Sequence, residues 1–332
     1  AVGNSSSGLR YGPFTSRMRQ TSTSPILHNI CSFPVLRYFV RLIVRSIRVF
    51  TSAGVSIDEE WRILEVNGPY LSPEELFPTA GPEARETIKE HVPQQLCAET
   101  GRLILPIQGF LLKTPSHIVL VDSCVGNDKS NPNTPDWNMR SDDRFMAALT
   151  AAGIGPEDVD YVLCTHLHAD HVGWNTRLED GRWVPTFANA RYLMPTADEA
   201  FFRGLAGNAY TQSVLPVIEA GQTELVSAGH MLGDYITLIP TPGHTPGHVS
   251  VLVKSGAAEA IITGDALHTS AQCWRPDWHF KYDTDADLAV ISRRKLLEDA
   301  SEANRKVLGT HFALPSIGRV KAHGDAFRWE DD

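Results

Sequence analysis

Short apolar segments, bounded by Gly, Pro or polar residues, recur between residues 102 and 311 of the 332-residue chain. Their length and their content of β-branched residues are typical of buried strands. The first two, 102–114 and 117–122, meet at a Pro-Ser turn and predict a β-hairpin. Six more strands are predicted: 159–165, 190–195, 235–240, 248–254, 259–265 and 306–311. Strand 306–311 is expected to be the last strand of the chain.

Three segments between these strands have apolar residues at helical spacing. Residues 141–152 begin with a polar N-cap and end before Gly153, and residues 284–304 are rich in good helix formers. A third helical segment is expected from residue 196 to about residue 219. Strands with interleaved helices, and no internal repeat or linker, predict one α/β domain over residues 58–332.

Residues 1–57 form a different, basic extension, with seven Arg and no acidic residue. Its first part is rich in Ser, Thr and Arg, a composition typical of disordered chain. Such a density of charge excludes a transmembrane span. The apolar second part is expected to pack on the domain as a helix or strand, or to serve as a membrane-surface helix, a targeting element or a dimerisation arm. On a helix, four arginines would form one charged stripe: Arg37, Arg41, Arg45 and Arg48.

The net charge of −9 is unevenly distributed, because residues 58–332 carry 23 basic and 39 acidic side chains. A domain with a net charge of −16 would repel a phosphate backbone, which argues against a nucleic-acid partner. An odd number of cysteines without a C-x-x-C pair argues against a disulfide framework and favours a reducing, cytoplasmic setting. The five cysteines are Cys31, Cys97, Cys124, Cys164 and Cys273.

Candidate metal ligands gather where the predicted strands end. The stretch "CTHLHADHVGW", directly after strand 159–165, holds four of them within six positions. Three more stand alone, in "TPGHTPGH", "TGD" and "GTH", each beside a strand end. Imidazole and carboxylate side chains of this kind suit zinc. The seven candidates are His166, His168, Asp170, His171, His244, Asp265 and His311.

Seven ligands are more than one tetrahedral zinc ion uses, since such an ion takes three or four from the protein. Two ions that share one carboxylate use all seven, with three His on one ion, two His and one Asp on the other, and a bridging Asp. The sequence therefore predicts two Zn²⁺ per chain. A lone His such as His311 is more often a structural residue than a ligand. A non-catalytic scaffold protein would be expected to have lost some of the ligands, whereas all seven are present in this sequence.

These motifs, "HLHADH", "TPGHTPGH", "TGD" and "GTH", resemble those of the metallo-β-lactamase superfamily over about residues 60–330. The resemblance implies an α/β fold, the αββα sandwich, with a dinuclear site at one edge. It also implies that Asp265 bridges the two zinc ions. By the same likeness, the first ion takes His166, His168 and His244, and the second takes Asp170, His171 and His311.

Details of the motifs distinguish branches of this superfamily. Di-iron redox members resemble H-x-E-x-D-H, whereas His168 occupies the Glu position here and favours zinc-dependent hydrolysis. Asp265 separates the chain from true β-lactamases, and the short tail after His311 separates it from glyoxalase II. The order of motifs is most similar to methyl parathion hydrolase-like and lactonase-like members. Acyl-homoserine lactonases carry Tyr where this chain has His268.

The resemblance implies a hydrolase that uses a metal-bridging hydroxide to cleave a small ester, lactone or phosphotriester. A hydrolytic dehalogenase or a β-lactam hydrolase on the same site is the alternative. Asp170 would orient the nucleophile, and His268 would hydrogen-bond the substrate oxygen or protonate the leaving group. Asp122 is a candidate acceptor for a ligand imidazole, or else a turn cap.

A small apolar or aromatic substrate is expected, because aromatic residues follow Asp265 closely in the sequence. The same residues would serve equally as core or as the interface of a homodimer. The four residues of this expected aromatic wall are Trp274, Trp278, His279 and Phe280.

Overall fold

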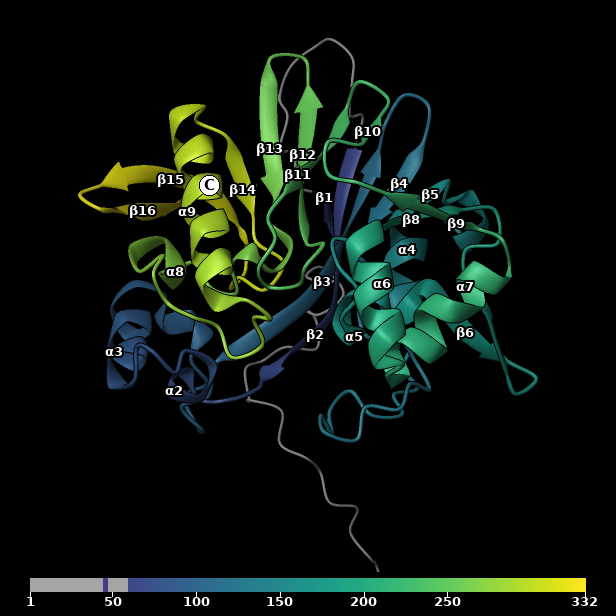
Figure 1. Ribbon diagram of the computed structural model, residues 1–332, viewed down its shortest axis with the longest axis horizontal. Helices are drawn as coiled ribbons and strands as arrows, with labels where there is room; N and C mark the ends of the chain where they lie inside the picture. Colours follow the sequence, from purple (N-terminus) through teal and green to yellow (C-terminus); the bar gives the residue numbers. More distant parts are fainter. Residues whose placement is uncertain (1–43, 47–58) are drawn as a thin grey trace, which may run out of the picture. The chain divides into compact units, whose positions relative to one another are not determined.

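Two seven-stranded mixed sheets form the centre of the computed structural model, which describes residues 44–46 and 59–332 (Figure 1). The first sheet has the order β1 (Val44–Ser46), β2 (Glu59–Pro69), β3 (Ile104–Lys113), β4 (Ile118–Val121), β5 (Tyr161–Leu163), β8 (Arg191–Pro195) and β9 (Thr223–Val226). The second has the order β10 (Met231–Leu232), β11 (Ile236–Pro240), β12 (Val249–Ser255), β13 (Ala258–Ile262), β14 (Lys306–Leu308), β15 (Ile317–His323) and β16 (Ala326–Asp331). A separate hairpin pairs β6 (Thr176–Glu179) with β7 (Arg182–Pro185).

Helices cover the outer faces of both sheets. Figure 1 shows α8 and α9 on one side and α4, α6 and α7 on the other. The α-helices are α2 (Pro73–Leu76), α3 (Pro82–His91), α4 (Arg144–Ala151), α5 (Ala169–Val172), α6 (Thr196–Leu205), α7 (Leu215–Glu219), α8 (Ala271–Trp274) and α9 (Ala286–Glu302). The order of layers is helix, sheet, sheet, helix, so the predicted αββα sandwich is confirmed.

Alternation along the strands builds three apolar layers from the two sheets. Leu163 of β5 lies between the sheets in one buried cluster with Val251 of β12. Its neighbour Val162 points to the other face and joins the cluster that contains Phe145 of α4. On the outer face of the second sheet, Leu296 of α9 packs in a third cluster. The inter-sheet layer holds together the two sheets that carry the candidate ligands.

The predicted strands are present, although strands 159–165 and 259–265 end early, at Leu163 and Ile262. Strand 306–311 ends at Leu308, as β14, and it is not the last strand. The antiparallel pair β15 and β16 follows it and turns at residues 324–325, where Gly324 has a φ of +59°. The alternating pattern of these two strands and the Gly-Asp turn between them are hairpin signals that the sequence analysis missed.

The helix expected over residues 196–219 is interrupted. Helix α6 ends at Leu205, Ala206 adopts a left-handed φ of +48°, and a π-helical turn, η4 (Tyr210–Val214), precedes α7. Gly204 and Gly207 are poor helix formers on either side of the break. Helix α4 begins at Arg144 rather than at residue 141, and α9 begins after Asp285, whose side chain accepts a hydrogen bond from the Leu288 N–H at 3.0 Å.

Most of the basic extension lies outside the described residues. Its exception, Val44–Ser46, is a strand that pairs antiparallel with β2, so at this point the backbone is not helical. Among the described residues, no helix is long and apolar enough to cross a membrane. Membrane contact, dimerisation through this segment and the domain boundary at residue 57 stay predictions. The four described cysteines are buried and not bridged.

Replacing Leu163 with Ala tests the inter-sheet layer. Leu163 is 1% exposed, and its loss leaves a cavity between the sheets, so we expect the free energy of unfolding to fall by about 2–5 kcal/mol. Urea denaturation followed by circular dichroism measures this change. Ile291→Ala on α9, where the side chain is 63% exposed, is the matched control and should change it by about 0.5 kcal/mol or less. Equal effects of both substitutions would contradict the assigned packing.

Candidate metal centre

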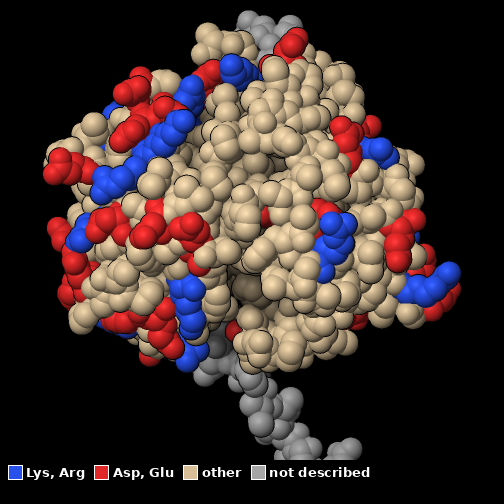
Figure 2. All heavy atoms as spheres, viewed as in Figure 1, with Lys and Arg blue, Asp and Glu red and all other residues tan. Residues whose placement is uncertain are grey.

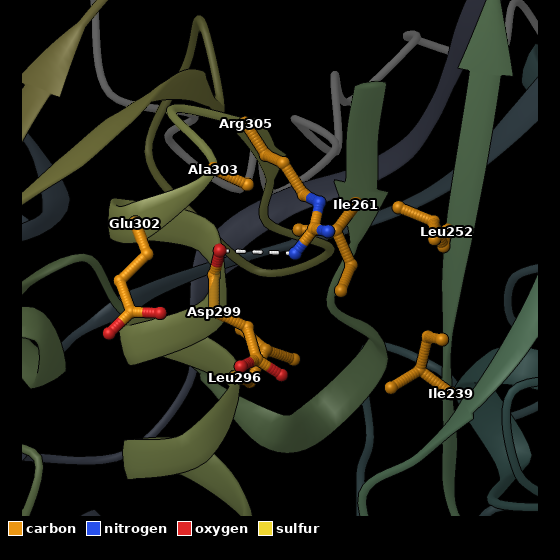
Figure 3. Close-up of a pocket in the computed structure, with 8 residues that line it drawn as sticks. All are labelled: Ile239, Leu252, Ile261, Leu296, Asp299, Glu302, Ala303 and Arg305. Carbon is orange, nitrogen blue, oxygen red and sulfur yellow. Dashed lines mark hydrogen bonds between the residues drawn. The ribbon is translucent and has the colours of Figure 1, made fainter.

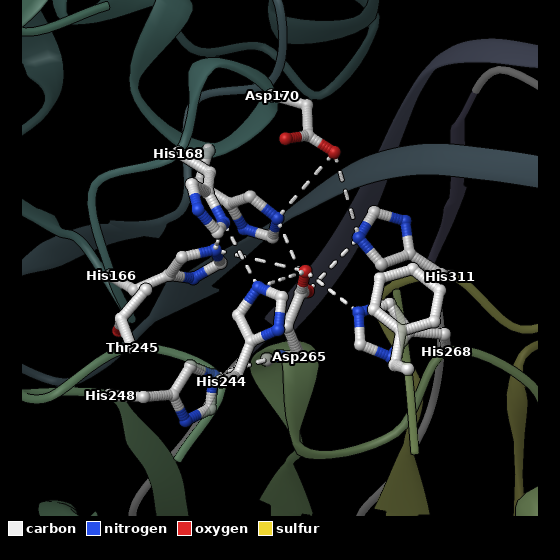
Figure 4. Close-up of polar contacts among 12 residues, drawn as sticks. His166, His168, Asp170, His244, Thr245, His248, Asp265, His268 and His311 are labelled. Atoms are coloured by element: carbon white, nitrogen blue, oxygen red, sulfur yellow. Dashed lines mark hydrogen bonds and ion pairs between the residues drawn. The ribbon is translucent and has the colours of Figure 1, made fainter. Parts of the chain in front are cut away.

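The seven candidate ligands converge from both sheets at one edge of the sandwich (Figure 4). The first sheet supplies four of them, because β5 runs directly into the His166–His171 stretch and the short helix α5. The second sheet supplies the others from the loop between β11 and β12, from the turn after β13, and from the residues after β14. Parallel pairing of β13 with β14 brings the last two of these segments together.

Three imidazoles form the first group. His168 Nδ1 lies 2.9 Å from His166 Nε2 and 2.9 Å from His244 Nε2. One carboxylate oxygen of Asp265 joins them, with Oδ2 at 3.2 Å from His244 Nε2 and 3.7 Å from His166 Nε2. These atoms surround one point from several sides, as the ligands of a single ion do.

The second group faces the other oxygen of the same carboxylate. Asp265 Oδ1 lies 3.2 Å from His171 Nε2 and 3.0 Å from His311 Nε2. Asp170 completes this group, with Oδ2 at 3.7 Å from each of the two imidazole nitrogens. Asp265 is therefore shared between two sets of potential ligands, one on each oxygen.

The chemistry of these atoms fits zinc. His171 Nε2 and Asp265 Oδ1 are buried without a hydrogen-bond partner among the described residues, although both point into the cluster. Spacings near 3 Å match the edge of a zinc coordination tetrahedron, about 3.3 Å for the bond lengths of zinc to nitrogen. Burial lowers the pKa of His166 and of His168 well below the usual value. The negative charge of Asp265 raises the pKa of the other three ligand imidazoles, His171, His244 and His311, so metal binding there would displace protons.

Hydrogen bonds hold the outer nitrogen of several ligand imidazoles. Asp122 Oδ2 lies 2.9 Å from His171 Nδ1, so this residue contacts a ligand imidazole as expected from its place after strand β4. The sequence analysis missed two further partners. Asp283 Oδ1 lies 3.0 Å from His244 Nδ1, and the Pro106 carbonyl lies 2.7 Å from the Nδ1 of His311. Such contacts fix both the tautomer and the orientation of a metal-binding ring.

His248 is another functional residue that the sequence analysis overlooked, although it repeats the P-G-H pattern of His244. Its Nε2 accepts a hydrogen bond of 2.8 Å from the backbone N–H of Asp265. Burial lowers the pKa of His248 to about 3, so the ring is neutral and can accept. Gly264 has a φ of +52°, and a Cβ there would lie 2.7 Å from His248 Nε2. His248 and Gly264 thus position the bridging carboxylate through its backbone.

A cavity of about 170 Å³ opens directly over the two groups. His268 and Phe280 line it, and their rings stack with centroids 3.3 Å apart. Of the described residues that line it, none is Lys or Arg. Figure 2 shows a hollow near the centre of the face that it draws, bordered largely by residues without charge. The lining residues are Tyr70, Leu105, Trp137, His168, Ala169, Asp170, His244, Asp265, His268, Phe280, Tyr282 and His311.

The expected aromatic wall is correct only at Phe280. Trp278 is 1% exposed and packs on Phe77 beneath the site. Trp274 stacks on His91, and His279 pairs with Asp287 at 3.2 Å, so none of these three side chains lines the cavity. Tyr70 and Trp137, from segments far away in the sequence, and Tyr282, two residues after Phe280, take their place. Of the aromatic side chains that follow Asp265 in the chain, only Phe280 and Tyr282 line the cavity, so closeness to Asp265 in the sequence was an incomplete guide.

A second cavity, of about 290 Å³, lies between α9 and the outer face of the second sheet (Figure 3). Arg305 crosses it and donates a hydrogen bond of 3.0 Å to the Asp299 carbonyl. Its described lining holds neither His nor Cys and shares no residue with the metal centre. The chemistry of the molecule is therefore assigned to the first cavity.

Replacing Asp283 with Asn tests the support of the ligand His244. The amide removes the negative charge beside the imidazole, so we expect zinc affinity to fall about 10- to 100-fold. Competition with a chromophoric chelator measures the affinity. Asp287→Asn, four residues away with a side chain that is 89% exposed, is the control and should leave affinity unchanged. Unchanged affinity in Asp283→Asn would show that His244 needs no such support.

The comparisons with known proteins agree with this geometry. The model of the metallo-beta-lactamase superfamily matches residues 106–311, a span that contains all seven candidate ligands. An N-acyl homoserine lactonase from Bacillus sp is 26% identical over 211 residues, which cover 59% of this chain and 78% of that protein.

Two solved structures share the fold. The hydrolase AbOPH superposes with a TM-score of 0.70 at 23% identity, covering 85% of this chain and 96% of that one. The dizinc quorum-quenching lactonase AidC superposes with a TM-score of 0.70 at 19% identity, covering 87% and 97%. The family match spans more than half of the sequence and the metal-ligand motifs are complete, so the chain belongs to the metallo-beta-lactamase superfamily and is a metal-dependent hydrolase.

Proposed function

We propose that this protein is a dinuclear zinc hydrolase that cleaves a small, uncharged lactone or ester. The observation that carries the proposal is the position of Asp265, whose two oxygens face two separate sets of ligands. Relatives named as N-acyl homoserine lactonases, and the fold shared with a dizinc lactonase, support the choice of a cyclic ester.

The residues of the two groups have distinct tasks in this proposal. His166, His168 and His244 would hold one zinc ion, and Asp170, His171 and His311 the other, with Asp265 between them. The pair of ions would supply a hydroxide nucleophile near neutral pH and an electrophile for the carbonyl oxygen of the substrate. Asp170, which lines the cavity, would in addition accept a hydrogen bond from the attacking water and so orient it.

The charge of the cavity favours neutral substrates. Lactones, esters and phosphotriesters carry no charge, whereas β-lactam antibiotics carry a carboxylate, for which a basic side chain beside the metal centre would be a suitable partner. The described residues that line the cavity provide no Lys or Arg for such a group. This observation favours a lactone or ester over a β-lactam, one of the two alternatives raised by the sequence; it does not bear on the other, a hydrolytic dehalogenase.

Metal analysis and a hydrolysis panel test the proposal together. We expect about two zinc ions per chain and turnover of a γ-lactone, an N-acyl homoserine lactone or an aryl ester, with a phosphotriester and a cephalosporin for comparison. In Asp265→Ala the shared ligand is lost, so zinc content should fall to about one ion or less and most activity should disappear. Glu302→Ala, an exposed carboxylate on α9, is the matched control and should retain both.

Two results would contradict this function. Full activity with one zinc ion per chain would refute the dinuclear site. Turnover of the cephalosporin alone, by the zinc-loaded protein, would replace the lactone or ester with a β-lactam as the substrate.

We further propose that His268 donates a hydrogen bond to the substrate oxygen. Its ring lines the cavity, with Nε2 3.2 Å from Asp265 Oδ2 and Nδ1 buried without a partner in the described part of the chain. Zinc bound to Asp265 would compete for the oxygen that Nε2 now faces, which leaves the ring N–H for the substrate. In this position the donor would stabilise charge on the leaving oxygen.

His268→Ala should retain both zinc ions and lower kcat about 10²-fold or more for an alkyl ester, whose alkoxide leaves poorly. For a 4-nitrophenyl ester, whose leaving group is stable without a donor, the loss should be much smaller. Steady-state kinetics on both esters, with metal analysis, measures this difference, and His323→Ala on the surface strand β15 is the control. Equal losses on both esters, or loss of zinc, would remove this role.

A further inference from the structure

A loop of residues 128–140, here named the Trp137 loop, forms part of the cavity wall. Two backbone hydrogen bonds close its neck, from Asp128 N–H to the Arg140 carbonyl and from Met139 N–H to the Lys129 carbonyl, both at 2.8 Å. Between them the loop presents Trp137, which is half-buried and lines the cavity over the metal centre. The function proposed above gives this loop no task.

Lys129 anchors the base of this loop. It is 3% exposed, and its Nζ donates to the Thr176 hydroxyl and to the Gln212 carbonyl, the latter at 3.2 Å. The Nζ also lies 3.5 Å from the centre of the Trp183 ring. Gln212 binds the loop a second time, because its Oε1 accepts from the N–H of Ser130 at 3.0 Å. A buried side chain with three such partners fixes the loop against β6, β7 and η4.

The Trp137 ring is held in place on its other side by Tyr70, at the end of β2. The two rings are stacked with centroids 5.4 Å apart and an angle of 8° between their planes. The Tyr70 hydroxyl lies 3.1 Å from that of Tyr282, which reaches in from the segment after α8. Phe280, stacked on His268, is the remaining aromatic ring of the lining. Four aromatic side chains from three separate segments thus border one small cavity.

The dimensions and the chemistry of this cavity restrict what it can accept. At about 170 Å³ it is smaller than most ligand sites, so a long flexible chain would have to remain largely outside. Aromatic walls favour a flat ring, which stacks on them or meets them edge to face, over a puckered ring of equal size. The described lining holds no Lys or Arg, so no basic side chain is present there to pair with an acidic group on this ring.

We propose that the Trp137 loop and Tyr70 form a binding wall for an uncharged, planar aromatic group of the substrate, with Lys129 as the positioning residue that holds this wall. The inference rests on the proposed hydrolase function and narrows its substrate to aryl- or arylalkyl-bearing esters and lactones. Trp137 contacts the aromatic group, whereas Lys129 acts through the loop.

Benzyl acetate and cyclohexylmethyl acetate test the proposal, because their leaving alcohols are similar in size and reactivity and differ in planarity. We expect the zinc-loaded enzyme to prefer benzyl acetate in kcat/KM. Trp137→Ala should reduce this preference about 3- to 10-fold, mainly through a higher KM for benzyl acetate. Met139→Ala removes an exposed apolar side chain from the same loop and should leave the preference unchanged. An equal preference in Trp137→Ala and the unsubstituted enzyme would overturn the proposal.

Lys129→Met tests the positioning role separately. The substitution keeps most of the length of the side chain and removes the Nζ atom with its hydrogen bonds to Thr176 and Gln212, so we expect the benzyl preference to fall as in Trp137→Ala. The zinc content should remain unchanged, which a general loss of structure would not allow. A variant that retains the full benzyl preference would refute the role of Lys129.

Direct binding distinguishes failure of this inference from failure of the proposed hydrolase function. Isothermal titration of the zinc-loaded protein with 2-naphthol and with decahydro-2-naphthol requires no turnover. We expect tighter binding of 2-naphthol, weakened about 3- to 10-fold by Trp137→Ala. If the enzyme cleaves neither acetate but this binding pattern holds, the function fails and the aromatic wall stands. If the two naphthols bind equally, the aromatic wall is refuted whatever the enzyme hydrolyses.

Discussion

The carboxylate of Asp265 is the constraint on which the site depends. One of its oxygens faces His244 and the other faces His171 and His311, so the residue belongs to both ligand groups. Its position is set through the backbone by the neutral ring of His248. A carboxylate buried among five imidazoles is stable only if cations or protons balance it, and two zinc ions satisfy this condition with the atoms that the chain provides.

The sandwich explains why the ligands come together. One strand of the first sheet, β5, leads into the H-x-H-x-D-H stretch. The loops at the strand ends of the second sheet carry His244, Asp265 and His311, so neither sheet holds a complete site. Packing of the two sheets through the inter-sheet apolar layer unites the halves. Stability of that layer and assembly of the metal centre are therefore linked, and the cavity lies at the edge where loops from both halves meet.

The fold class and the seven candidate ligands could be predicted from the sequence because the signals for strands and for metal ligands are both local. Strand ends and His spacing can be read within a few residues. The other side of the cavity wall could not be predicted in this way, since Tyr70 and Trp137 meet Phe280 and Tyr282 only in three dimensions. Trp278 was misplaced because a Trp in a loop has the same local signal whether it faces a cavity or, as here, the core beside Phe77. The break after α6 depends on Ala206, a residue that favours helices in isolation.

Diffraction from crystals of the zinc-loaded protein, recorded at the zinc absorption edge, tests the shared role of Asp265 most directly. The account predicts two anomalous peaks about 3.5–4 Å apart, with one oxygen of Asp265 bound to each. One peak should lie among His166, His168 and His244, and the other among Asp170, His171 and His311. A single peak in fully active crystals, or two peaks with Asp265 bound to only one of them, would contradict it.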